Sequence, residues 1–183
     1  MTEPLHNRYL AVPPSGKGAG VLVLHAWWGL NDVMREFCDR LAQAGFVALA
    51  PDMFSGRVLR TIEEAEAHVS QLDWEHTVPP EILSGVEVLS KHPAVTGNGL
   101  ATVGFSFGGF WALWLAQKKP ELIRAVTLFY GTNGGGGDFT EGLLPAHPTA
   151  ARATTATDSL AAEFMWWPPT ISREPDSGHG CPS

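Results

Sequence analysis

Four short apolar runs, each separated from the next by a helical pattern, constrain the fold of this chain more than any other feature. The runs occupy residues 21–25, 46–52, 100–105 and 125–131, and a shorter one at 9–12 precedes them. A continuous apolar run rich in valine and leucine is typical of a strand that is buried on both faces. Such strands, alternating with amphipathic helices, form a parallel sheet covered on both sides. The sequence therefore predicts the α/β class.

The segments between these runs carry helical signals. Residues 31–45 have Asn31 as an N-cap and Gly45 as a C-terminal stop. Their apolar residues at helical spacing are Val33, Met34, Phe37, Leu41 and Ala44. Residues 61–95 hold two helical patterns, which we expect Pro79 and Pro80 to separate, and a further helix is predicted over 108–119. The inward stripe predicted for the second pattern is Ile82, Leu83, Val86 and Leu89.

The composition changes after Tyr130. Residues 132–183 are rich in Gly, Ala, Thr and Pro, with no convincing amphipathic helix and only a weak strand pattern at 163–167. A segment of this length without regular structure is unusual inside a compact domain. We therefore expect two regions: a folded core over 1–131, and an atypical, partly disordered C-terminal segment over 132–183.

Charge and apolar content exclude several classes of partner. Of the 183 residues, 44% are hydrophobic, which is sufficient to bury a core. The formal net charge is −7 and the pI is near 5.4, and no basic block is interleaved with aromatics, so we expect no nucleic acid partner. The longest mostly apolar run, 21–30, is too short to cross a bilayer, and we expect a cytoplasmic location. The expected partner is a small molecule, and the oligomeric state is left open.

The two cysteines, Cys38 and Cys181, provide neither a disulfide framework nor the spacing of a zinc site. Cys38 lies within a predicted helix and is expected to act as a small buried hydrophobe. The sequence thus predicts no metal and no cofactor.

A glycine-flanked serine stands between the third of the four apolar runs and the helix after it. The residues Gly104, Phe105, Ser106, Phe107 and Gly108 match the pattern G-x-S-x-G. A strand that turns into a helix within so few residues forces the serine into a strained backbone conformation, and the glycines remove Cβ atoms that would collide. Although a glycine-serine turn is often only a turn, the strand before it and the helix after it favour a nucleophile.

Two backbone groups are predicted to hold an oxyanion beside this serine. The helix that begins there directs its unpaired N–H groups at the serine, so the N–H of Phe107 is the first donor. The loop "HAWWGL" after the run at 21–25 offers the N–H of Trp27 as the second. The loop position of Trp27 and Trp28 favours contact with a substrate. His25, which ends the same run, is expected to make a structural hydrogen bond.

Three segments together resemble the dienelactone hydrolase family of α/β-hydrolases. They are "GVLVLHAWWGLNDVMREFCDRLAQAGFVALAPDMFSG", "GNGLATVGFSFGGFWALWLA" and "AVTLFYG", and the likeness covers about residues 8–131. The resemblance implies an α/β-hydrolase fold and the hydrolysis of an ester or lactone through a covalent acyl-enzyme.

The chain departs from the founding members of that family at three points. They carry a cysteine nucleophile where this chain has Ser106, as many relatives do, and a glutamate where it has Ala26. The arginines that hold an anionic lactone have no clear counterpart; Arg60 is the nearest candidate, although a solvated surface charge is the favoured explanation of it. A dienelactone substrate is therefore not expected.

The fold's chain order of serine, acid and histidine limits the choice of catalytic partners. The acids after Ser106 are Asp138, Asp158 and Asp176, and the bases are His147 and His179. The turn "PDSGHG" resembles the catalytic-histidine turn of the family, which favours His179 as the base. Asp158 stands 52 positions after Ser106 and 21 before His179, close to the separations in the family. Asp158 is therefore the preferred acid, although no apolar strand precedes it.

Two functions from different classes remain open at this stage. The first is a serine hydrolase that uses Ser106, His179 and Asp158 on a small ester or lactone. The second is an impaired remnant of the fold that binds small acyl compounds without turnover, because the chain stops four residues after His179, where the family continues with a helix.

Overall fold

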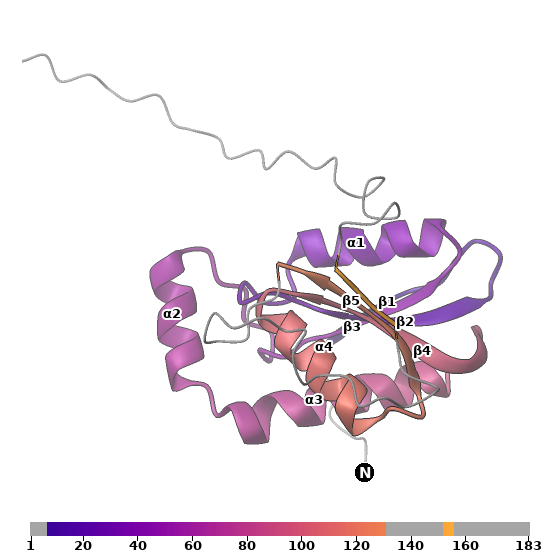
Figure 1. Ribbon diagram of the computed structural model, residues 1–183. Helices are drawn as coiled ribbons and strands as arrows, with labels where there is room; N and C mark the ends of the chain where they lie inside the picture. The colour runs from indigo at the N-terminus through magenta and orange to yellow at the C-terminus, as the bar shows by residue number, and fades with distance from the viewer. Residues whose placement is uncertain (1–6, 131–151, 156–183) are drawn as a thin grey trace, which may run out of the picture.

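The computed structural model describes residues 7–130 and 152–155. Its strands are β1 (Arg8–Ala11), β2 (Gly18–Leu24), β3 (Val47–Pro51), β4 (Val95–Phe105), β5 (Ile123–Phe129) and β6 (Arg152–Thr155). Its helices are α1 (Asp32–Gln43), α2 (Ile62–Gln71), α3 (Trp74–Ser90) and α4 (Phe107–Lys118). The strands form one sheet in the order β1-β3-β2-β4-β5-β6, in which β1 alone runs antiparallel to its neighbour (Figure 1). The predicted α/β class and mostly parallel sheet are confirmed.

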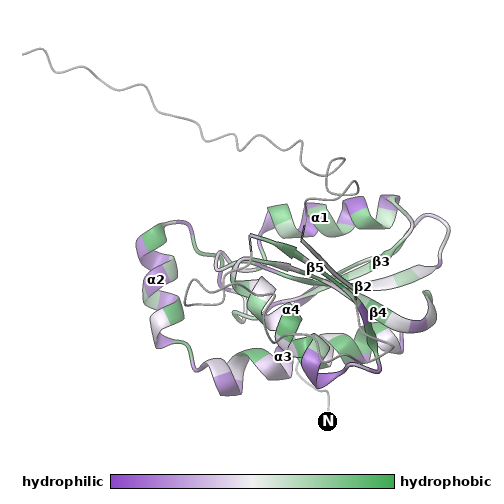
Figure 2. Ribbon diagram, in the orientation of Figure 1, coloured by the Kyte–Doolittle hydropathy of each residue, from purple (hydrophilic) through white to green (hydrophobic). Residues whose placement is uncertain are grey.

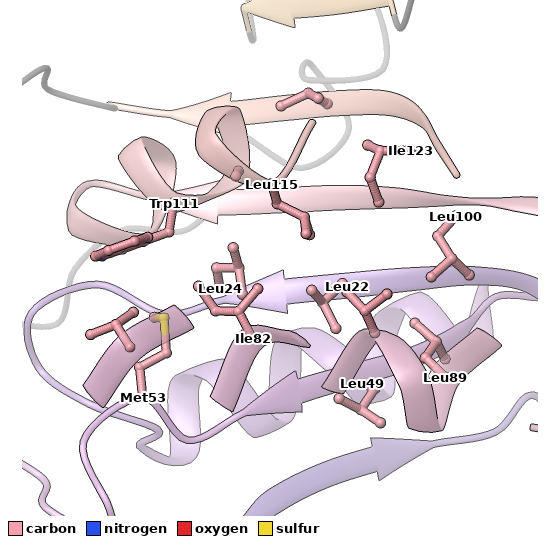
Figure 3. Close-up of a cluster of buried hydrophobic side chains, with 14 of the residues drawn as sticks. Leu22, Leu24, Leu49, Met53, Ile82, Leu89, Leu100, Trp111, Leu115 and Ile123 are labelled. Carbon is pink, nitrogen blue, oxygen red and sulfur yellow. The ribbon is translucent and has the colours of Figure 1, made fainter. Parts of the chain in front are cut away.

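Helices cover both faces of the sheet. On β2, Leu22 and Leu24 belong to the cluster that packs against α3 and α4, whereas Val21 and Val23 belong to the cluster that packs against α1. Successive side chains of a strand point to opposite faces, so an unbroken apolar run supplies both layers. Figure 3 shows the α3 and α4 side of the core, where Leu22, Leu24 and Ile82 meet.

The cap residues of α1 behave as predicted. The Asn31 side chain accepts a hydrogen bond from the N–H of Met34 at 3.2 Å, and Gly45 has a φ of +96° just beyond the helix. The predicted apolar stripe is only partly right, because Val33 is half exposed and Ala44 is exposed. Cys38 is fully buried, as predicted, and lies on the buried face of α1 together with Ala42.

The predicted helix break at Pro79 and Pro80 is wrong. The two helices meet at Leu72 and Asp73, and both prolines lie inside α3. Asp73 caps α3 by accepting from the N–H of His76. The prolines remove two backbone donors, and the carbonyls left without them belong to the exposed residues Glu75 and His76, where water can solvate them.

Burial on α3 explains why the helix continues through the prolines. Val78, Ile82 and Leu89 are fully buried against the sheet, and each such side chain contributes about 1.5–3 kcal/mol. The predicted stripe is confirmed except for Leu83, which is exposed. By contrast, α2 is hydrophilic over much of its surface and buries only Ala65 (Figure 2).

Strand β6 adds an element that the sequence did not predict. Arg152–Thr155 pairs parallel with β5, Leu128 lying opposite Thr155. The strand pattern expected at 163–167 lies outside the described residues. Among the helices that the structure describes, none combines the length and apolarity needed to span a membrane.

Candidate active site

The sheet order places a topological switch point at the carboxyl ends of β2 and β4. These strands are neighbours, with Leu24 opposite Gly104. From β2 the chain passes through α1 to β3 on one side, and from β4 it passes through α4 to β5 on the other. Because α1 and α4 cover opposite faces (Figure 1), the two connections diverge at this point. Open α/β sheets bind ligands at such a topological switch point.

Ser106 stands at this switch point, between the end of β4 and the start of α4. Its backbone has φ +48° and ψ −111°, a region that L-residues with a Cβ rarely adopt. Its N–H donates to the Phe129 carbonyl at 3.0 Å, and its carbonyl accepts from the N–H of Gly109 at 2.8 Å. Within the described chain, the hydroxyl makes no capping bond to α4. The predicted strained turn is confirmed: Ser106 is half-buried, and its hydroxyl does not cap the helix that it begins.

The two glycines of the motif allow close backbone approach. A Cβ at Gly104 would lie 2.4 Å from the Gly108 carbonyl oxygen, which folds back from the first turn of α4. A Cβ at Gly108 would lie 2.2 Å from the carbonyl oxygen of Leu24 and 2.7 Å from that of His25. The start of α4 therefore packs directly against the carboxyl end of β2, where the loop with Trp27 begins.

The first turn of α4 has the properties of an anion site. Its leading N–H groups, including that of Phe107, have no partner within the helix, and the helix dipole places partial positive charge there. Phe107 itself is buried and its ring packs against Phe54 and Trp74. The roles of Phe107 and Trp27 as oxyanion donors stay predictions.

The loop after β2 is held in place on its far side. The Trp28 carbonyl accepts from the N–H of Leu59 at 3.0 Å, and Gly29 approaches Arg57 so closely that a Cβ would lie 2.1 Å from the Arg57 carbonyl oxygen. Trp27 and Trp28 are half-buried, with their rings edge to face at 5.4 Å. Arg60, just beyond this contact, is exposed, and its part in substrate binding stays a prediction.

His25 is fully buried and makes the structural hydrogen bonds expected of it. Its Nδ1 lies 2.8 Å from the Ala26 carbonyl oxygen, and its Nε2 accepts from the N–H of Met53 at 3.0 Å. Burial lowers the pKa of His25 to about 4, against the opposing effects of the Ala26 carbonyl and of Asp52. The imidazole is therefore neutral at physiological pH.

Asp52 is a buried polar residue that the sequence analysis missed. Its two carboxylate oxygens accept from the N–H groups of Phe54 at 3.0 Å and Gly56 at 2.6 Å. It closes the turn after β3, which packs beside the loop after β2. An aspartate directly after a buried strand, with a glycine four residues further on, is the signal that could have revealed this turn.

The acid and base expected from the sequence, Asp158 and His179, lie outside the described residues, as do Asp138, Asp176 and His147. Within the described ranges, no group of three His, Cys, Asp or Glu side chains could hold a metal ion. Cys38 is no rival to Ser106, since burial raises the pKa of its thiol to about 12.

The strand, the strained serine, the helix and the neighbouring loop define an α/β-hydrolase core. Residues 7–159 match the model of the dienelactone hydrolase family, and the chain belongs to that family. The match extends beyond the 8–131 of the sequence resemblance and includes β6.

Two relatives and one solved structure illustrate the similarity. The chain is 34% identical to "Protein usf" of Aquifex pyrophilus, covering 67% of this chain and 55% of that protein. It is 36% identical to the "Probable 2-oxo-3-(5-oxofuran-2-ylidene)propanoate lactonase" of a Bradyrhizobium species, covering 67% of this chain and 50% of that one. The solved structure "m3DLH" aligns with a TM-score of 0.59 at 30% identity, over 77% of this chain and 57% of that one. The chain thus spans about half the length of the curated relatives it matches.

Proposed function

We propose that this chain is a serine hydrolase that cleaves a small ester or lactone through an acyl-enzyme on Ser106. The observation that carries the proposal is the backbone of Ser106, with φ +48° at the junction of β4 and α4 and a hydroxyl that α4 does not use as a cap. Strained backbone of this kind persists where the surrounding structure imposes it, and it concentrates at functional sites. The family membership of the chain supports the same chemistry.

In the proposed reaction, Ser106 Oγ attacks the carbonyl carbon and its proton passes to His179. The resulting oxyanion is held by the N–H groups of Phe107 and Trp27. Collapse breaks the ester C–O bond, and the leaving alkoxide takes the proton from His179. Water then attacks the acyl-enzyme with His179 as base, which releases the acid and restores the serine.

The position of β6 supports Asp158 as the residue that orients His179. Parallel pairing with β5 brings the Thr155 end of β6 to the same edge of the sheet as Ser106. Asp158 follows Thr155 by three residues, a reach of at most about 11 Å. Two strand spacings separate β4 from β6, about 10 Å. A strand that ends at this edge, three residues before Asp158, therefore supports Asp158 as the proposed acid.

The substrate proposal rests on the loop after β2. The half-buried rings of Trp27 and Trp28, in the loop after the strand next to β4, offer an apolar surface that suits the hydrocarbon part of a small ester or lactone. Arg60 is the proposed contact for a substrate carboxylate. The lactonase name of the Bradyrhizobium relative agrees with a cyclic ester.

The test combines a fluorophosphonate probe with p-nitrophenyl acetate turnover. We expect stoichiometric labelling of Ser106, and loss of both labelling and turnover in Ser106→Ala. Ser90→Ala, which removes an exposed serine at the end of α3, is the matched control and should behave as wild type. An unlabelled wild-type protein that is folded would refute the nucleophile.

The acid and base are tested separately. His179→Ala and Asp158→Asn should retain some labelling and lose turnover, since the acylated serine then lacks its base. Full turnover in His179→Ala would transfer the role to His147. Labelling of wild type without turnover would favour the second function, a binding remnant of the fold.

A further inference from the structure

The peptide group between Ala26 and Trp27 is fixed by two hydrogen bonds to one atom. The Ala26 carbonyl oxygen lies 2.8 Å from His25 Nδ1 and accepts from the N–H of Gly29 at 3.1 Å. The described chain contains no cis peptide bond, and in a planar trans peptide the C=O and N–H point in opposite directions. Whatever holds the Ala26 carbonyl therefore sets the direction of the Trp27 N–H.

The hydrogen bonds of His25 determine which of its ring nitrogens carries the proton. Nε2 faces the N–H of Met53 at 3.0 Å and must accept, so the proton of the neutral ring is on Nδ1. Nδ1–H then donates to the Ala26 carbonyl. The ring is fully buried and packs edge to face against Phe54 at 4.9 Å, so it has no freedom to turn away.

The bond from Met53 links this ring to a rigid turn after β3. Asp52 accepts from the N–H groups on both sides of that turn, at Phe54 and Gly56. Its Oδ1 lies 3.9 Å from His25 Nε2, too far for a hydrogen bond. The contacts thus run from the Asp52 turn through Met53 and His25 to the Ala26 carbonyl, across 28 positions of sequence.

We propose that His25 is a positioning residue for the oxyanion hole: its imidazole locks the Ala26–Trp27 peptide so that the Trp27 N–H faces the reacting carbonyl oxygen. The inference rests on the proposed function, because it concerns the Trp27 N–H, one of the two oxyanion donors in that proposal. A ring that only fills the core would not need a donor at Nδ1 aimed at that particular carbonyl.

Two substitutions separate positioning from packing. The amide nitrogen of asparagine occupies the place of His Nδ1, so His25→Asn can still donate to the Ala26 carbonyl but cannot reach Met53. The amide of glutamine occupies the place of Nε2, so His25→Gln can still accept from Met53 but removes the side-chain donor to the Ala26 carbonyl, which keeps its bond from the N–H of Gly29. Both remove the ring, and we expect similar losses of thermal stability.

The two variants should differ in kcat and in their rate of labelling by fluorophosphonate. We expect His25→Asn to keep kcat and the fluorophosphonate labelling rate within about tenfold of wild type, and His25→Gln to lose roughly 100-fold with little change in KM. Equal rates in the two variants, or rates that follow thermal stability alone, would overturn the proposal.

NMR can detect the hydrogen bond between His25 and the Ala26 carbonyl independently of turnover. In wild type, ¹⁵N NMR should show a protonated Nδ1 and an unprotonated Nε2 on His25, and the ¹³C shift of the Ala26 carbonyl should be kept in His25→Asn and move upfield in His25→Gln. An unprotonated Nδ1 would overturn the inference, even in an active enzyme. Absence of labelling in wild type, with the expected NMR pattern, would instead count against the proposed function.

Discussion

Gly108 lies so close to Leu24 that a Cβ at Gly108 would stand 2.2 Å from the Leu24 carbonyl oxygen. The contact joins the first turn of the helix after the serine to the end of the strand before the Trp27 loop. Backbone meets backbone here, so neither side can yield by a change of rotamer. The spacing between the proposed nucleophile and the proposed second oxyanion donor therefore depends on the absence of a single methyl group.

Gly108→Ala should disrupt the site and destabilise the protein. The methyl group must displace either α4 or the end of β2, which we expect to cost about 1–3 kcal/mol of unfolding free energy and most of the activity. Urea unfolding and the fluorophosphonate labelling rate measure the two effects.

Gly85→Ala is the matched control for that substitution. Gly85 also lies in a helix packed on the sheet, but its added Cβ would meet side-chain atoms of Leu49, Pro51 and Leu22 at 3.2–3.3 Å. Small shifts and the better helix propensity of alanine should leave its stability within about 1 kcal/mol of wild type. If both variants lose stability equally, the backbone contact is not the cause.

The strained backbone of Ser106 predicts an unusual order of stability. At φ +48° and ψ −111° glycine is unstrained, so Ser106→Gly should be more stable than Ser106→Ala by about 1–2 kcal/mol in chemical unfolding. Both variants lose the hydroxyl, so their activities should be equally absent. At Ser90, in the last turn of α3, the order should reverse, because alanine is the better helix former.

His25 predicts a stability change in mildly acidic solution. Its pKa falls from 6.5 to about 4 on folding, chiefly through burial. Between these two pH values His25 is therefore protonated in the unfolded chain and neutral in the folded chain. This contribution to stability is complete above pH 6.5 and is lost as the pH falls toward 4, by about 3 kcal/mol in total. The difference in unfolding free energy between wild type and His25→Asn should shrink over that range. A difference independent of pH would contradict a neutral buried imidazole.

Pro80 predicts a substitution that stabilises. Pro80 is exposed and sits inside α3, where it removes a donor and crowds the carbonyl of His76. Pro80→Ala restores the backbone bond and should raise the unfolding free energy by about 1–3 kcal/mol. Ser84→Ala in the same helix should change it by only about half a kcal/mol.

The parts of the fold that could be predicted are those in which local pattern and burial agree. The apolar run at 21–25 had to be a buried strand, and Asn31 and Gly45 fixed the ends of α1. The prolines of α3 misled the prediction because tertiary burial of Val78 and Ile82 outweighs the local cost. Strand β6 was missed because four residues at the edge of the described sheet need no apolar run to pair.

The candidate site also has one part that the sequence could predict and one part that it could not. Ser106 and its glycines could be recognised because the elbow is a local structure whose residues are adjacent in sequence. The link from Met53 through His25 to Ala26 could not, since it depends on two loops that only the sheet order brings together. The triad partners, the cytoplasmic location and the absence of a nucleic acid partner stay predictions.

The backbone of Ser106 has a consequence for how substitutions at this position would be selected. A fold selected for stability alone would replace this serine with glycine, because glycine relieves the strain and alters no capping bond. Stability favours glycine at this position, whereas the proposed chemistry requires serine. In a laboratory population selected for thermal stability without selection for hydrolysis, the replacement of Ser106 by glycine should be among the first substitutions to appear.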